Sequence, residues 1–422
     1  MVRRRACGRQ PGQPGYAHNR DMTTPHGKTL NHAPIDAPPA AATDAHPFER
    51  LTPDVVLDAL SSIGLWGDGR LTPLNSYENR VYLAHLDEPV QGHPAVVLKF
   101  YRPERWRTEQ IDEEHAFSAE LVQAEVPVVA PLALPGMADT GNGAPATLHR
   151  HAGFGFSVSP YKGGRRPELD NLDVLEWTGR FIARLHSVGE VRPFVHRPAL
   201  NAATFALASR DWLLGHHCIP LDMQSRWEAT LTQTLTVLAQ VAPELCGSPS
   251  SISTSETIAI DAYQKSVEGD FYSEKISSDA DSIRTNLRLH GDCHPGNILW
   301  TPTDLPGGGP HFVDLDDART GPAVQDLWML LPGDDRREQT LALSALIDGY
   351  EQFRPFDRRE LRLIEPLRTL RQIHYNAWLA RRWADPAFPA NFPWFGSSDY
   401  WAGQIHQLEE QIEAMERPPL VV

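Results

Sequence analysis

The chain has 422 residues, of which 41% are apolar and 22% charged, and its formal net charge at pH 7 is −15. This acidic balance argues against a protein that binds nucleic acid or an anionic membrane through excess Lys and Arg. No stretch approaches the roughly 18 apolar residues of a membrane span, and the four cysteines lack Cys-x-x-Cys spacing. We therefore expect a cytoplasmic protein without a disulfide framework or a zinc knuckle.

Two segments lack the apolar periodicity of folded structure. Residues 1–46 are rich in Pro, Gly, Ala, His and Arg, and residues 247–281 are serine-rich and acidic. Neither composition can bury enough apolar surface to order a chain. We expect a disordered tail at 1–46 and a surface insertion at 247–281, with an N-terminal lobe at 47–160 and a C-terminal lobe at 161–418.

The N-terminal lobe begins with a short helix for which Thr52 is the predicted cap. A strand at 95–101 follows, and its apolar density predicts burial of Lys99, which must then find a partner. The next helix is expected to begin at a Thr108 cap and carries Glu114. Lys99 and Glu114 are the predicted pair, in preference to the neighbouring Glu113, although a solvated surface pair remains an alternative.

An alternating strand at 154–161, followed by Gly163 and Gly164, resembles a hinge between two lobes. Helical periodicity starts at Asp170, and further helices are expected at 227–241, 325–331, 338–353, 358–383 and 400–415. The stretch 383–395 is unusually aromatic and Pro-rich. It could wall a cleft, or it could be a packed C-terminal loop.

The chemically informative motif runs from His290 to Asn297 and reads His-Gly-Asp-Cys-His-Pro-Gly-Asn, with Asp314 further on. Predicted strands at 286–289, 298–300 and 311–313 place Asp292 and Asn297 in a tight loop and Asp314 at a strand end. Acidic groups at strand ends face a cleft, so these side chains should lie together.

This set matches the needs of phosphoryl transfer from ATP. Asp292 would orient the attacking hydroxyl and accept its proton, and Asn297 and Asp314 would hold Mg²⁺ on the phosphates. Lys99, aimed by Glu114, would position the nucleotide. The rival interpretation is a metallohydrolase with His290, Asp292 and His294 as ligands, joined by further carboxylates downstream. It leaves Asn297 and Lys99 without a role.

Two features depart from the common protein-kinase pattern. The loop at 75–79 has no Gly-x-Gly-x-x-Gly and would have to use backbone N–H groups and the Ser76 hydroxyl. Gly291 stands where an arginine usually precedes the catalytic aspartate. That arginine would read a phosphate on an activation segment, so we expect no control by loop phosphorylation.

Several runs together resemble the bacterial stress response kinase A family, which is similar in fold to aminoglycoside and choline kinases. The resemblance covers about residues 48–418 apart from the insertion, and the runs that carry it are 71–82, 99–106, 289–300, 312–331 and 381–386. It implies an α+β, two-lobed protein-kinase-like fold, with a small mixed-sheet N-lobe and a larger helical C-lobe.

The resemblance also implies ATP-dependent phosphorylation of serine or threonine in proteins during a stress response. Carried over residue by residue, it makes Asp292 the proton acceptor, Asn297 and Asp314 the Mg²⁺ ligands and Ser76 a contact to ATP. We expect a monomer that labels itself and a protein substrate. A small-molecule alcohol kinase of the aminoglycoside or choline type is the alternative.

Overall fold

The computed structural model describes residues 46–135, 145–246, 283–305, 307–333 and 335–422. Apart from residue 46, the predicted tail lies outside these ranges, and so does the predicted insertion at 247–281. Both therefore stay predictions. Within the described ranges, no helix combines the length and the apolar character needed to cross a membrane.

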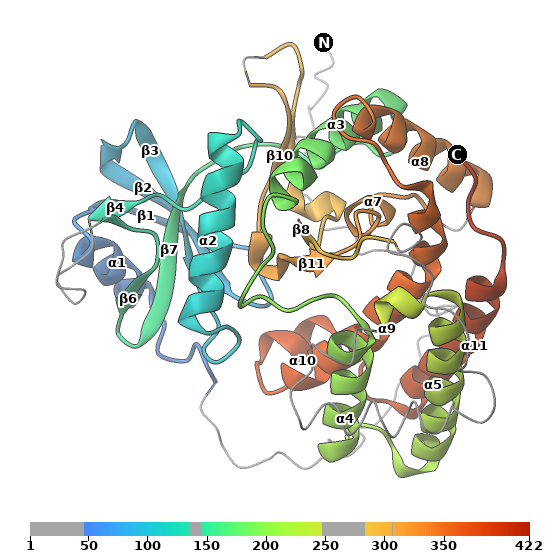
Figure 1. The fold of residues 1–422 in the computed structure, drawn as a ribbon. Helices are drawn as coiled ribbons and strands as arrows, with labels where there is room; N and C mark the ends of the chain where they lie inside the picture. The colour runs from blue at the N-terminus through green and yellow to red at the C-terminus, as the bar shows by residue number, and fades with distance from the viewer. Residues whose placement is uncertain (1–45, 136–144, 247–282, 306, 334) are drawn as a thin grey trace, which may run out of the picture. The chain divides into compact units, whose positions relative to one another are not determined.

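A five-stranded sheet in the order β1-β2-β3-β7-β6 forms the first part of the described chain (Figure 1). Its strands are β1 (Gly67–Leu74), β2 (Arg80–Val90), β3 (His93–Phe100), β6 (His149–His151) and β7 (Phe154–Pro160). All neighbouring strands are antiparallel, whereas a mixed sheet was expected. The β2–β3 connection shows one cause: Gln91 and Gly92 both have positive φ, 49° and 85°, as a two-residue hairpin turn requires.

Helix α1 (Pro53–Ser62) begins as predicted, because Thr52 Oγ1 accepts a hydrogen bond from the Val55 N–H at 3.4 Å. Helix α2 (Thr108–Gln123) differs by one residue from its prediction. Its cap is Arg107, whose backbone N–H donates to Gln110 Oε1 at 3.0 Å. The glutamine side chain satisfies a donor at the helix start, so Thr108 is the first helical residue rather than the cap.

Two short strand pairs frame the predicted catalytic residues. Strand β8 (Leu287–Leu289) pairs with β11 (Arg319–Gly321), and β9 (Ile298–Thr301) pairs with β10 (Gly309–Phe312). Three of these confirm the strands predicted from the motif. A further two-stranded pair joins β4 (Leu134–Pro135) to β5 (Pro145–Ala146).

The rest of the described chain is mainly helical (Figure 1). Its longer helices are α3 (Leu172–Gly189), α4 (Ala208–Gly215), α5 (Leu221–Val241), α8 (Arg336–Tyr350), α9 (Ile364–Arg381) and α11 (Ser398–Glu416), with the short α7 (Gln325–Trp328) and α10 (Ala387–Asn391) between them. Each lies where helical periodicity was predicted, except α4 and α10, for which no prediction was made.

The buried apolar side chains form two main cores. The smaller one joins the sheet to α1 through Leu60, Leu98 and Phe156. The larger one gathers the helical part and includes Phe117 and Leu121 of α2. Helix α2 therefore buries its apolar face among the C-terminal helices, although the chain places it between two strands of the sheet. This packing decides which partners its charged residues meet.

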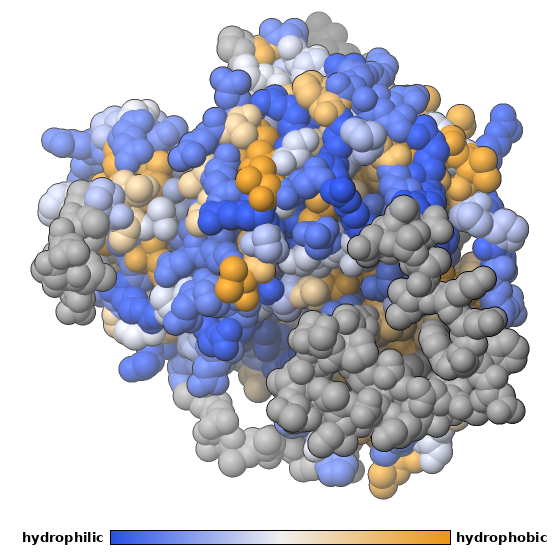
Figure 2. Space-filling view, viewed as in Figure 1, coloured by the Kyte–Doolittle hydropathy of each residue, from blue (hydrophilic) through white to orange (hydrophobic). Residues whose placement is uncertain are grey.

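The surface drawn in Figure 2 is mainly hydrophilic, and its apolar residues occur as small separate patches. Large apolar side chains that are exposed, such as Trp66, Val195 and Leu221, come from different elements. Single exposed apolar residues are normal on a protein surface and indicate no docking face by themselves.

Candidate active site

Asp292 and Asn297 lie in the loop that joins β8 to β9, which ends in a single helical turn at Pro295–Asn297. Asn297 Nδ2 donates to the backbone oxygen of Asp292 at 3.0 Å and to its carboxylate Oδ2 at 3.4 Å. These bonds fix both side chains relative to each other. Among the described residues they leave the amide oxygen of Asn297, the atom able to ligate a cation, without a hydrogen-bond partner.

Asp314 follows β10 and is joined to the same loop, because the Val313 N–H donates to the backbone oxygen of Asn297 at 3.0 Å. Its φ is +60°, a left-handed conformation that a non-glycine residue holds at a cost of about 1–3 kcal/mol. The side chain remains 49% exposed. Backbone strain at a residue with an accessible carboxylate is typical of an active site or a ligand-binding site.

Lys99 leaves β3 and pairs with the carboxylates of the predicted site. Its Nζ lies 2.8 Å from Asp314 Oδ1 and 3.1 Å from Asp316 Oδ1. Burial alone would lower the pKa of Lys99, but Asp314, Asp316 and Glu114 outweigh it and hold this pKa well above its ordinary value. The lysine therefore stays charged and can meet an anionic group.

The predicted direct pair of Lys99 with Glu114 is wrong. Glu114 Oε2 accepts from Arg197 Nη2 at 3.0 Å, and both side chains are almost completely buried. Arg197 also donates to the backbone oxygen of Asp316 at 2.8 Å. The reason is the packing of α2 on the C-terminal helices, which brings Glu114 to the Arg197 loop. Glu114 still helps to keep Lys99 charged, because its carboxylate raises the pKa of the lysine.

Asp316 and Asp317 lie in the short helical turn Leu315–Asp317 that follows Asp314. Arginines from two parts of the chain bind them. Arg105 contacts both carboxylates, with Nη2 at 2.9 Å from Asp317, and Arg319 Nη2 lies 2.6 Å from Asp317. Burial would raise the pKa of Asp316, but Arg105 and Lys99 lower it to about 2. Both carboxylates are therefore ionised, and the charges of the arginines and of Lys99 neutralise them. These ion pairs rigidify the turn that carries Asp314.

Asp326 of α7 holds the loop between β8 and β9 that contains Asp292. Its two carboxylate oxygens accept from the backbone N–H groups of His290 at 2.8 Å and Gly291 at 2.9 Å. His290 Nε2 lies 3.0 Å from the Val313 backbone oxygen, so the imidazole joins the loop to the Asp314 turn by hydrogen bonding. His294 Nδ1 accepts from the Gly296 N–H at 2.9 Å.

Both imidazoles of the rival metallohydrolase interpretation are thus engaged in holding the loop. The part of the chain that the structure describes contains no group of three or more His, Cys, Asp or Glu residues arranged to hold a metal ion.

Gly291 has a steric reason for replacing the arginine of the common kinase pattern. Its φ is +83°, and a Cβ at this position would lie 2.1 Å from the backbone oxygen of Asp317. No other residue fits without displacing the Asp317 turn. The absence of a side chain at Gly291 thus permits the Asp292 loop to lie against the turn that contains Asp314 and Asp317.

The 75–79 loop, which contains Ser76, joins β1 to β2 and reaches both the site and the C-terminal segment. Asn79 Nδ2 donates to Asp316 Oδ2 at 3.1 Å, and Asn79 Oδ1 accepts from the Arg102 N–H at 3.0 Å. Glu78 accepts from Trp378 Nε1 at 2.7 Å. Ser76 is half-buried beside these anchored residues. Its predicted contact to ATP stays a prediction.

The aromatic 383–395 segment packs against this loop. Tyr77 lies against the rings of Phe388 and Phe392, with centroids 6.4 and 5.3 Å away. Asp385, only 1% exposed, is bound by Arg80 at 2.8 Å and Arg102 at 2.7 Å. The segment therefore anchors the loop between β1 and β2, a contact that sequence reasoning did not foresee.

The predicted hinge strand is β7, and the Gly-Gly bend follows it. A Cβ on Gly164 would lie 2.8 Å from Leu299 Cβ, so the glycine permits a close approach to β9. The backbones of Arg165 and Trp300 bond to each other at 3.0 and 2.6 Å. The exposed Arg165 side chain pairs with Glu168 at 2.7 Å, as in a solvated turn. A hinge role for this strand and bend stays a prediction.

One residue that sequence reasoning missed touches the centre of the site. Arg371 of α9 places Nη1 2.7 Å from Asp292 Oδ1. Burial would raise the pKa of Asp292, but Arg371 and His294 lower it, so the carboxylate is ionised and can accept a proton. The two residues are 79 positions apart, and no local pattern links them.

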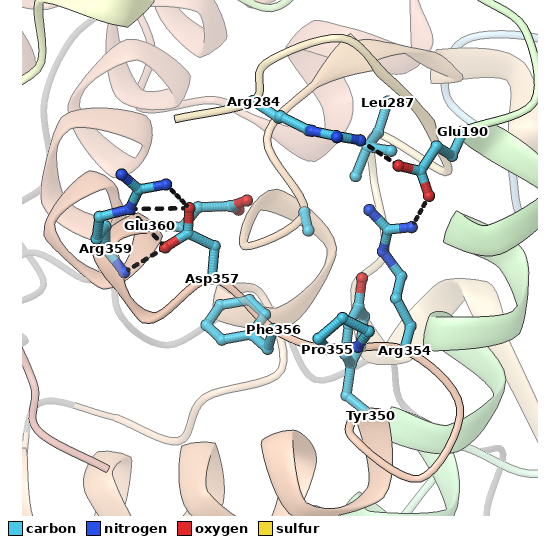
Figure 3. Close-up of a pocket in the computed structure, with 11 residues that line it drawn as sticks. Glu190, Arg284, Leu287, Tyr350, Arg354, Pro355, Phe356, Asp357, Arg359 and Glu360 are labelled. Carbon is cyan, nitrogen blue, oxygen red and sulfur yellow. Dashed lines mark hydrogen bonds and ion pairs between the residues drawn. The ribbon is translucent and has the colours of Figure 1, made fainter. Parts of the chain in front are cut away.

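A cavity of about 560 Å³ lies elsewhere, and none of the predicted site residues lines it. Figure 3 shows Glu190 held between Arg284 and Arg354, and Asp357 bound by Arg359. Five charged residues of its wall are thus paired with one another, whereas Glu360 accepts from the Val324 N–H. Tyr350 in the wall lies 2.9 Å from His186, which in turn contacts Asp326 at 3.1 Å. These hydrogen bonds connect the cavity wall to Asp326, which holds the loop that contains Asp292.

The fold and the site define a phosphotransferase, and the comparisons agree. The sequence profile of the phosphotransferase enzyme family (APH) matches residues 70–364. Amicoumacin kinase, solved in complex with AMP-PNP and Ca²⁺, aligns with a TM-score of 0.54 and 19% identity over 87% of this chain and 95% of its own. A microcompartment-associated aminopropanol kinase aligns with a TM-score of 0.55 and 16% identity, covering 86% of this chain and 96% of its own. These two solved structures share the fold.

Sequence relatives are more specific. Stress response kinase A of Escherichia coli K12 is 43% identical over 376 residues, which cover 89% of this chain and 97% of that protein. The serine/threonine protein kinase RdoA of Salmonella typhimurium LT2 is 42% identical over 377 residues, with the same coverage. The chain therefore belongs to the phosphotransferase enzyme family and, within it, to the stress response kinase A family. The predicted family, two-lobed α+β fold and kinase activity are confirmed.

Proposed function

We propose that this kinase uses ATP and Mg²⁺ to phosphorylate serine or threonine in proteins, in the cytoplasm and as part of a stress response. The observation that carries the proposal is the similarity to stress response kinase A and RdoA over almost their whole length. The arrangement of Asp292, Asn297, Asp314 and Lys99 in one site supports it. We further propose that the chain consists of lobes at 47–160 and 161–418. We propose that it acts as a monomer, with no nucleic-acid or membrane partner.

Asp292 is the proposed proton acceptor. Its carboxylate is ionised, accepts from the Asn297 amide, and stands in a loop whose backbone is held by Asp326. A substrate hydroxyl placed against it would be aligned for attack on the terminal phosphorus, and its proton would pass to the carboxylate. Positioning of this kind, with electrostatic stabilisation, supplies most of the catalysis in phosphoryl transfer.

Asn297 and Asp314 are the proposed metal ligands, and the residues present fit that role. Both offer oxygen atoms, which Mg²⁺ prefers, and the Asp314 carboxylate is half exposed. When bound, Mg²⁺ would neutralise charge on the phosphates. Lys99 is the proposed phosphate contact: its ammonium now neutralises Asp314 and Asp316, so a nucleotide would exchange those ion pairs for phosphate contacts.

Incubation with labelled ATP and Mg²⁺, with and without a whole-cell protein extract, tests the proposal. We expect label in serine or threonine of polypeptides, including the kinase itself, and no label with Asp292→Asn. Label that accumulates in a small alcohol and in no polypeptide would favour the aminoglycoside or choline type of activity. Hydrolysis supported by Zn²⁺ rather than Mg²⁺ would favour the metallohydrolase.

A further inference from the structure

Arg371 differs from the other cations around the site in what it binds. Lys99 pairs with Asp314 and Asp316, Arg105 and Arg319 pair with Asp317, and Arg197 pairs with Glu114 of α2. Arg371 instead pairs with Asp292, the proposed proton acceptor, at 2.7 Å. A structural ion pair has no need to involve the residue that must meet the substrate.

Arg371 is also the most exposed of these cations. Its side chain is 34% exposed, compared with 15% for Lys99, 13% for Arg105, 7% for Arg319 and 0% for Arg197. Only one of its terminal nitrogens, Nη1, has a hydrogen-bond partner among the described residues. A guanidinium carries five N–H donors in a planar fork, so donors remain for a second anionic group.

The position of Arg371 is fixed by the core. Leu367, Leu370 and Ile373 of α9 are buried in the larger core on the same helix. The guanidinium thus projects from a packed helix rather than from a loop. A donor on such an element can be held ready at the place where charge develops, without reorganisation during the reaction.

We infer that Arg371 is a catalytic residue that donates to the phosphoryl group during transfer, while it remains bound to Asp292 Oδ1. This inference rests on the proposed phosphoryl transfer at Asp292. In the step, the bond from phosphorus to the leaving oxygen of the nucleotide breaks and its electron pair stays on the diphosphate. The acceptor oxygen forms the new bond to phosphorus, and its proton passes to Asp292. Negative charge spreads over the equatorial oxygens of the phosphoryl group during the step. The N–H donors of Arg371 Nη2 stabilise this charge by hydrogen bonding.

The test compares ADP with ADP plus fluoroaluminate and Mg²⁺, a mimic of the group in transfer, by titration against wild type and Arg371→Ala. We expect ADP affinity to change by less than about twofold and affinity for the mimic to fall about 100-fold. Turnover should fall about 100-fold or more. Arg371→Lys, which keeps the charge but loses the fork, should lie between. If the alanine variant does not fold, the same titrations with Arg371→Lys test the inference.

Arg368→Ala is the matched control. Arg368 is one turn away on α9, where it stacks on Trp328 and pairs with Glu365 at 3.1 Å, so both affinities should stay unchanged. The mimic titration needs no acceptor, so it decides on Arg371 even if wild type labels no polypeptide and the proposed function fails. Equal weakening of ADP and the mimic in Arg371→Ala and Arg371→Lys, or no weakening of either, would overturn the inference.

Discussion

Lys99 Nζ and Asp314 Oδ1 lie 2.8 Å apart, although the residues are 215 positions apart in the chain. One residue comes from the five-stranded sheet and the other follows β10, so the ion pair joins the proposed phosphate contact to the proposed metal ligand. Because Asp316 shares the same ammonium, a nucleotide and a metal ion that bind here replace contacts that already hold the site together. The roles of these residues can therefore be separated by binding experiments.

Asp292→Asn and Asp314→Ala should differ in nucleotide binding. Asp292→Asn removes the proton acceptor but keeps the shape of the side chain, so ATP affinity should stay within about twofold while transfer is abolished. Asp314→Ala removes a metal ligand, so ATP affinity measured with Mg²⁺ should fall about tenfold or more. Titrations with and without Mg²⁺ measure this. An equal loss of affinity in both variants would contradict the assigned division of roles.

Glu114→Gln should act mainly on stability. The residue is buried against Arg197, and leaving that guanidinium without its carboxylate should cost about 3–5 kcal/mol of unfolding free energy. Glu168→Gln is the control, because the exposed pair with Arg165 should contribute less than about 1 kcal/mol. Urea unfolding measures both. A stable Glu114→Gln variant that has lost only ATP affinity would support the pair with Lys99 that the sequence suggested.

Gly291→Ala should destabilise the catalytic loop by about 3 kcal/mol or more, because strain at positive φ adds to a clash with the Asp317 oxygen. Gly69→Ala separates the two causes. Gly69 has φ +88°, but a Cβ at this position would meet no atom within 4 Å, so only strain of about 1 kcal/mol applies. Thermal and urea unfolding of both variants check this. Equal losses would mean that the close approach is unimportant.

Glu360→Gln should change how stability depends on pH. The pKa of Glu360 is raised from 4.5 to about 8, because burial, together with the nearby charge of Asp357, outweighs the lowering by the Val324 N–H and by Arg354. Because the folded protein then binds a proton that the unfolded chain lacks, stability is greatest below the unfolded pKa. It falls as pH rises towards 8, by up to about 1.4 kcal/mol per pH unit.

The glutamine variant cannot titrate and can still accept from the Val324 N–H, which bonds to Glu360 at 2.8 Å. The free energy of unfolding, measured from pH 5 to 8 in steps, should therefore decline less steeply than in wild type. Parallel pH profiles for the two proteins would show that Glu360 is ionised in the folded state at neutral pH.

The sequence predicted well those features that local pattern determines. Strand periodicity and the spacing of Asp292, Asn297 and Asp314 placed all three residues in one site, because a tight loop and the end of the paired strand leave little freedom. Thr52 as a helix cap followed from the same local logic.

Predictions that depended on tertiary packing failed or were not made. The partner of Glu114 was wrong because the buried face of α2 belongs to the C-terminal core, which no periodicity in α2 reveals. Arg371 was missed because its contact with Asp292 joins elements that are distant in the chain. The anchoring of Tyr77 by Phe388 and Phe392 was missed for the same reason.

The most direct test of the central claim follows label from ATP to protein hydroxyl groups. Dephosphorylated wild type and Asp292→Asn are each incubated with labelled ATP, Mg²⁺ and a generic protein acceptor, and the labelled amino acids are identified. The account predicts phosphoserine or phosphothreonine from wild type without a lag, since Gly291 leaves no arginine to read an activating phosphate, and none from the variant. Robust labelling of an amino-alcohol with no labelled polypeptide would contradict it.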